Sequence, residues 1–172
     1  MRQLGKQLIE QNIINIINKK ERMLTESSLL EQRRKDFPMF YNELMPSLVD
    51  FISKIGIDPS HEVLTQPPQY VPFIESALEE IAIVEADDRT WLLARLGYFI
   101  GEYFAQKFGG SWHVNEISGS RYFGRYVVGK FSLGGNSASM IDPFEIAQVF
   151  VDSPAPRKLT ALLSEVETEI ET

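Results

Sequence analysis

The sequence predicts a mostly helical α+β fold in which a β-hairpin at about residues 111–133 packs on a buried central helix at about 89–108. First, apolar residues recur at helical spacing in most segments outside the hairpin. Second, residues 111–133 are rich in β-branched and aromatic residues, with Ser-Gly-Ser in the middle as a turn. Third, a hairpin alone is only marginally stable, so the helix that precedes it is its expected support.

The composition favours one globular domain of residues 1–172, which is long enough for a single sizeable core. The chain has no cysteine, which excludes disulfides, thiolate metal sites and a cysteine nucleophile and fits a reducing compartment. The first residues lack the apolar run of a signal peptide. The most apolar stretch, 91–108, contains four polar or charged side chains, too many for a membrane span. We therefore expect a cytoplasmic protein without a membrane partner.

The formal net charge of −7 is unevenly distributed. Residues 1–40 carry 8 basic and 5 acidic side chains, whereas residues 41–120 carry 4 and 12. Proteins that bind nucleic acid need basic surfaces to contact phosphates. The acidic middle of this chain argues against a nucleic-acid partner.

The N-terminal part, residues 1–56, reads as three helices at about 3–22, 27–36 and 38–55. Pro46 should kink the third helix or mark the first turn of a new one, and Gly56 suits the C-terminal end. Residues 57–72 contain four prolines and are expected to form a long surface connection. Its length indicates either a functional loop or a boundary between the N-terminal helices and an α+β core at 73–172.

The core is expected to begin with a short helix at 73–82, followed by an acidic turn in which Asp87 or Asp88 caps the central helix. Most of that helix is apolar, which indicates near-complete burial. Gly97 and Gly101 share a face of small residues, which predicts that the backbone of another element crosses there. Only a narrow strip of the helix, with Glu102 on it, is polar.

After the hairpin, residues 134–140 read as a flexible connection. Asp142 and Pro143 suit the N-cap and first position of a short helix. Pro154 and Pro156 end that helix, and a last amphipathic helix begins near residue 157.

Four side chains around the hairpin mouth form the best candidate for an enzyme or small-molecule site: Glu102, His113, Arg121 and Arg125. Glu102 reads more simply as a solvated or ion-paired surface group, and His113 should point away from Trp112 because neighbours on a strand alternate. Arg121 and Arg125 share a strand face and could hold a carboxylate or phosphate together. No catalytic residue is assigned, although an enzyme or a small-molecule-binding domain stays the alternative.

No cofactor or metal is predicted. The two histidines, His61 and His113, lack the spacing of a helical zinc pair, and the acidic turn lacks the spacing of an EF-hand. The chain also lacks a phosphate-binding Gly-rich motif and the Gly-x-Ser-x-Gly turn of a serine hydrolase.

Three short motifs follow one another along the central part of the chain: Gly101-Glu102, then Gly109-Gly110-Ser111-Trp112, then Asp142-Pro143-Phe144. Their order resembles that of a group of uncharacterised bacterial domains, over about residues 90–150. The resemblance implies a bacterial cytoplasmic origin and no particular activity.

The function favoured by the sequence is non-catalytic binding of another protein. Residues 75–88 hold six carboxylates and no base, and such a face accelerates association with a basic partner. Glu79, Glu80, Asp87 and Asp88 are the expected contact residues, and an inhibitor-like or immunity-like role is the most specific form of this hypothesis. The isoleucine-rich N-terminal helix further suggests a homodimer.

Overall fold

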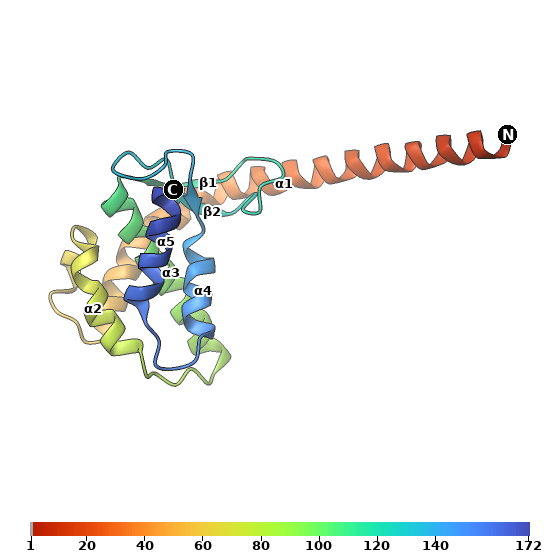
Figure 1. The fold of residues 1–172 in the computed structure, drawn as a ribbon. Helices are drawn as coiled ribbons and strands as arrows, with labels where there is room; N and C mark the ends of the chain where they lie inside the picture. The colour runs from red at the N-terminus through yellow and green to blue at the C-terminus, as the bar shows by residue number, and fades with distance from the viewer. Residues whose placement is uncertain (1) are drawn as a thin grey trace.

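The computed structural model describes the backbone of residues 2–172 and the side chains from Asn15 onward. The predicted α+β class is confirmed, since the chain forms five α-helices and one small antiparallel sheet, which lies at the end of the helical body where α1 leaves it (Figure 1). In chain order the elements are α1 (Arg2–Lys54), a 3-10 helix (Ser60–Leu64), α2 (Pro67–Leu78), α3 (Ala86–Phe108), β1 (Ser111–Val114), β2 (Tyr126–Gly129), β3 (Met140–Ile141), α4 (Pro143–Asp152) and α5 (Leu159–Glu171).

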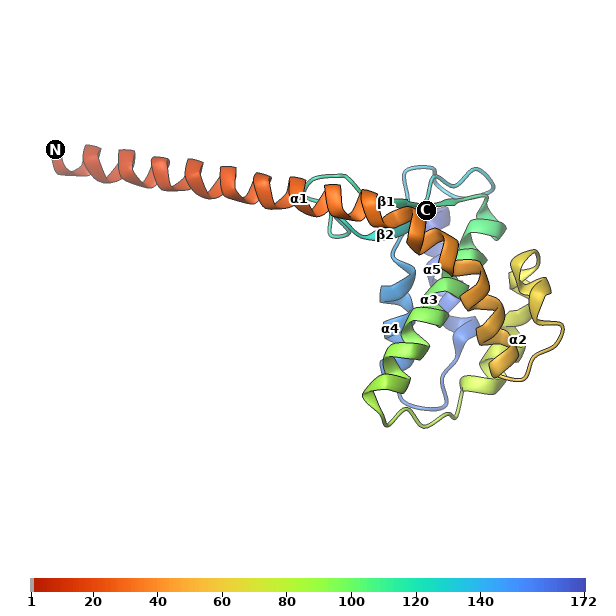
Figure 2. The same cartoon turned by 180° about the vertical axis from the view of Figure 1, so that it is seen from behind.

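The N-terminal region is one helix of 53 residues, so the prediction of three separate helices was wrong. No glycine or turn residue in the middle of the segment stops it, and Ser27 does not begin a new helix. Pro38 and Pro46 both lie inside α1, where each removes one backbone donor without ending the helix. Figure 2 shows that α1 changes direction where it reaches the body, as prolines commonly cause.

The two halves of α1 have different surroundings. The first half extends far from the rest of the molecule in both views, whereas the second half lies across the body (Figures 1 and 2). There, Leu44, Leu48, Phe51 and Ile52 are fully buried. They belong to one hydrophobic cluster that also takes residues from α2, α3, the sheet, α4 and α5.

Helix α3 is the centre of the body, as its apolar circumference predicted. Its two glycines allow close packing, but aromatic rings occupy the space where a crossing backbone was expected. A Cβ atom on Gly101 would lie 1.7 Å from Cζ2 of Trp112, and one on Gly97 would lie 2.4 Å from Cδ1 of Phe144. Both glycines are therefore required for the sheet and α4 to lie against α3.

The sheet contains the expected hairpin, with shorter strands than predicted and with a third strand added. β1 pairs antiparallel with β2, placing Trp112 opposite Val128, and β2 pairs with β3 on its other side. The expected strands at 111–117 and 121–133 were too long, because residues 115–125 form a compact loop. In this loop the Asn115 side chain accepts a hydrogen bond from the backbone of Ile117, and Gly119 and Gly124 have positive φ. Met140, expected in the flexible connection, and Ile141, expected at the opening of the short helix, form β3.

Helix starts follow the predictions in part. Asp142 caps α4 as expected, accepting hydrogen bonds from the backbone of Phe144 and Glu145. Helix α3 instead begins after Glu85, without a side-chain cap, so Asp87 and Asp88 lie in its first turn. The proline-rich segment 57–72 is also more ordered than predicted, because Pro67 and Pro68 occupy the first turn of α2.

Candidate functional site

The projecting half of α1 is the most unusual surface of the molecule. Its described side chains 15–25 are all exposed, including four large apolar ones. The exposed fractions are 66% for Ile16, 49% for Ile17, 60% for Met23 and 60% for Leu24. The other isoleucines of this segment, Ile9, Ile13 and Ile14, lie outside the described side chains. An exposed apolar stripe of this length is typical of an interaction surface.

The loop 115–125 marks the point at which α1 meets the body. It lies beside α1 in both ribbon views (Figures 1 and 2). Glu116 accepts two hydrogen bonds from the Arg34 guanidinium, at 2.6 and 2.7 Å. Nearer the N-terminus, a Cβ atom on Gly124 would lie 2.8 Å from Leu29. Ser118 also contacts Glu26, so the loop supports α1 from about residue 26 onward, whereas residues 15–25 are exposed.

The acidic stretch 75–88 is only partly available to a partner. Glu75 accepts a hydrogen bond from the backbone of Thr160 at 2.7 Å, which anchors the start of α5. Glu79 pairs with Lys158 at 2.7 Å. The other predicted contact residues, Glu80, Asp87 and Asp88, are exposed. Val84, 82% exposed, stands between them as an apolar residue surrounded by acids.

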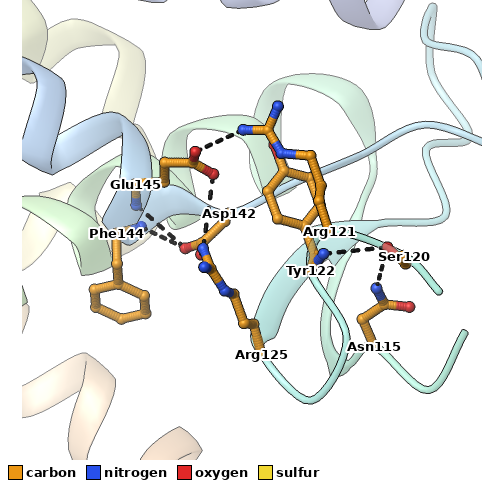
Figure 3. A network of polar contacts seen from close by, with 8 residues as sticks. All are labelled: Asn115, Ser120, Arg121, Tyr122, Arg125, Asp142, Phe144 and Glu145. Carbon is orange, nitrogen blue, oxygen red and sulfur yellow. Dashed lines mark hydrogen bonds and ion pairs between the residues drawn. The ribbon is translucent and has the colours of Figure 1, made fainter. Parts of the chain in front are cut away.

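Arg121 and Arg125 do hold carboxylates, but these belong to the protein itself (Figure 3). Arg125 Nη1 lies 2.8 Å from Asp142 Oδ2, and Arg121 Nη2 lies 2.6 Å from Glu145 Oε1. The Arg121 guanidinium also stacks over the ring of Tyr122, with its Cζ 4.6 Å from the ring centroid. Both arginines lie in or at the end of the loop and not on a strand. They tie this loop to the N-terminus of α4, so the predicted anion site is occupied internally.

His113 lines a cavity of ≈ 690 Å³ between α1, β1 and the connection before β3. Its Nδ1 lies 3.1 Å from the backbone oxygen of Ser111, and burial lowers the pKa of the imidazole, with a further contribution from the charge of Lys130. Lys130 adopts a left-handed φ of 57°, unusual for a side chain other than glycine. Because its pKa is lowered, the His113 imidazole is favoured in its neutral form.

Glu102 is buried, so the prediction of a solvated surface group was wrong. It is 5% exposed, and Trp112 Nε1 donates a hydrogen bond to its Oε1 at 3.0 Å. Burial raises the pKa of the Glu102 carboxyl, and hydrogen bonds from Trp112 and Gln106 offset part of that rise. Glu102 is covered because Trp112 of β1 packs over α3 beside it, and because residues of α1 line the same cavity.

The four hairpin-mouth residues do not form one site. His113 and Glu102 line two different cavities, and the arginines pair with α4. Within the part of the chain that the structure describes, no three His, Asp or Glu side chains are close enough to hold a metal ion. Among the described helices, none combines the length and apolar character needed to cross a bilayer.

Comparison with known proteins gives no relative: no family model, curated protein or solved structure matches the chain.

Sequence reasoning also missed Phe37 and Tyr41, which contribute to the cavity beside Glu102. The only available signal was that these aromatic residues lie one turn apart and so share a helix face.

Proposed function

We propose that the protein is a non-catalytic binding protein and that the projecting half of α1 is its interaction element, pairing first with a second copy of the chain. The exposure of Ile16, Ile17, Met23 and Leu24 on a helix that leaves the body carries this proposal. An isolated helix is marginally stable in water, and most helices gain their stability by packing an apolar face. A partner helix along this face would supply that packing.

The spacing of the apolar residues supports a helical partner. Ile16, Met23, Leu30 and Phe37 are seven residues apart, and the same line continues to Leu44 and Phe51 in the core. Exposure falls along it, from 66% at Ile16 through half-buried Leu30 and Phe37 to 0% at Leu44. The line drifts by only about 20° per step on a straight helix, as in coiled coils. The face that packs on the body thus extends beyond it.

Polar residues alternate with these apolar layers. Lys20 and Ser27 lie between the layers of Ile16, Met23 and Leu30. Polar residues in such positions weaken a coiled coil but fix its register. We therefore expect a modest, concentration-dependent dimer.

Light scattering of the full chain over a range of concentrations tests this proposal. The double change Ile16→Glu and Met23→Glu should give a monomer at concentrations where the unchanged chain is a dimer. Asn18→Glu with Thr25→Glu is the matched control, because it adds the same charge at the same spacing on exposed positions of the opposite face. A monomer mass for the unchanged chain throughout, or equal dissociation in both variants, would refute self-pairing.

The corner between α2 and α3 is a second candidate binding surface. Val84 and Ile81 are 82% and 42% exposed and lie among acidic side chains. An apolar anchor with a charged rim is a common form of binding site. We propose that this corner binds a basic protein, in an inhibitor-like or immunity-like role.

Capture of a basic partner at low and high salt from the native host tests the corner. The variant should neutralise Glu80, Asp87 and Asp88 and leave Glu79, because Glu79 pairs with Lys158 and its loss would disturb α5. Neutralising Glu165, Glu169 and Glu171, which are exposed on α5, removes the same charge elsewhere. Salt-sensitive capture lost only in the first variant supports the proposal, and equal capture by both variants contradicts it.

A further inference from the structure

A second cavity of ≈ 420 Å³ lies between α1, the end of α3 and the beginning of β1. This volume is within the usual range for small-molecule pockets, about 300–1,000 Å³. Three aromatic residues, Phe37, Tyr41 and Trp112, and one acid, Glu102, are among its lining residues. The cavity therefore combines π-systems with a carboxylate.

The Glu102 carboxylate has no cationic partner among the side chains that the structure describes. Glu102 is 5% exposed, and among the described side chains no Lys, Arg or His forms an ion pair with it. Its direct hydrogen bond comes from the neutral indole of Trp112, at 3.0 Å. Burying a carboxylate without a cation is costly, which agrees with the raised pKa of Glu102. A cation bound in the cavity would supply the missing charge.

The aromatic residues suit an organic cation better than a metal ion. The rings of Phe37 and Tyr41 have centroids 6.0 Å apart, and Trp112 is fixed in place because its ring fills the space above Gly101. Aromatic faces attract ammonium groups through their quadrupole, and recognition of quaternary ammonium ions uses such walls. A metal ion would need further oxygen or nitrogen ligands, and the described residues show no cluster of three acids or histidines.

We propose that this cavity binds a small organic ammonium ion, with Glu102 as its counter-ion and Phe37, Tyr41 and Trp112 as its aromatic wall. The site lies where α1 meets the body, beyond the projecting half of the helix. It therefore depends neither on self-pairing of α1 nor on a basic protein at the acidic corner.

Titration followed by the NMR signal of the Trp112 indole N–H tests the proposal in the full chain. The signal is distinguished from that of Trp91, the other tryptophan, with Trp91→Phe. The probes are choline and dimethylbutanol, its uncharged carbon isostere, in which a tert-butyl group replaces trimethylammonium. Butylamine serves as a primary ammonium probe. Choline or butylamine should shift the signal in a saturable way. Dimethylbutanol should bind at least about tenfold more weakly than choline.

Glu102→Gln should weaken binding of the ammonium probe by about tenfold or more, because it removes the charge and keeps the shape of the side chain. Glu165→Gln, which removes an exposed carboxylate on α5 outside this cavity, should leave binding unchanged. If Glu102→Gln does not fold, Tyr41→Leu replaces it, since Tyr41 is 41% exposed and its removal should weaken binding without loss of structure. No saturable binding of either ammonium probe, equal binding of the neutral isostere, or unchanged affinity in these cavity variants would overturn the proposal.

Discussion

Asp142 and Glu102 are both 5% exposed, yet their surroundings differ in charge. Asp142 accepts hydrogen bonds from two backbone N–H groups and from the Arg125 guanidinium, at 3.0, 3.3 and 2.8 Å. Glu102 has Trp112 as its nearest donor and no cationic partner in the described residues. A buried acid that caps a helix and pairs with arginine serves the fold, whereas a buried acid without a cation on a cavity wall is available for a ligand.

The contrast depends on how each acid is fixed in place. Asp142 is held by its own helix, because the cap involves residues two and three positions along the chain. Glu102 depends on residues distant in sequence: the indole of Trp112 must lie over Gly101, and α1 must close the cavity. Of the changes considered below, disturbing the packing around Glu102 should lower the free energy of unfolding most.

Gly101→Leu should have the largest effect and tests the packing around Glu102. Its Cβ would lie 1.7 Å from Trp112, so the indole must move away from α3. We expect the free energy of unfolding to fall by about 3 kcal/mol, the upper part of the usual range for overpacking. Urea unfolding followed by circular dichroism measures the change. Ala161→Leu, on the exposed face of α5, should change stability little, and an equal stability of both variants would contradict the packing model.

Asp142→Ala should lower the free energy of unfolding by an intermediate amount. It tests the buried acid that has a cationic partner, Arg125. It removes the α4 cap and the partner of Arg125, and loss of a cap alone costs about 1 kcal/mol, with charge-assisted hydrogen bonds adding to it. We expect a total loss of about 2 kcal/mol in unfolding free energy. Asp142→Asn should lose less, because asparagine also caps helices. Equal losses in the two variants would show that the cap is not what Asp142 contributes.

These two environments also show what could be predicted from the sequence. The cap at Asp142 was predictable because a cap involves neighbours in the chain, and the dense packing on Gly97 and Gly101 was predictable from their spacing. The burial of Glu102 was not predictable, because it follows from how Trp112 and α1, both distant in the chain, pack beside this residue. For the same reason the pairing of Arg121 with Glu145, 24 residues along the chain, was missed.

The single helix α1 was missed for a different reason. Prolines at 38 and 46 suggested separate helices, but a proline costs one hydrogen bond and some strain, and burial of the residues around Leu48 outweighs that cost. Turn-forming and helix-breaking residues can be recognised in a short stretch of sequence. The strength of packing depends on residues that are far apart in the chain. The length of the projecting helix therefore became visible only in the structure.

Glu102→Gln should change the free energy of unfolding least. The pH dependence of that change tests directly whether Glu102 is a buried acid without a cationic partner. Burial raises the folded-state pKa of Glu102 above its ordinary value of 4.5, so the unfolded chain ionises first as the pH rises. The unchanged protein should therefore lose stability, relative to Glu102→Gln, from about pH 4.5 upward until the folded-state pKa is passed. Urea unfolding of both proteins between acidic and neutral pH measures this difference. Glu116→Gln is a control of opposite sign, since Arg34 lowers the pKa of Glu116 and its neutralisation should remove stability at neutral pH. A stability difference between Glu102 and Gln that stays constant with pH would mean that the buried acid is already balanced in the free protein, and the contrast with Asp142 would disappear.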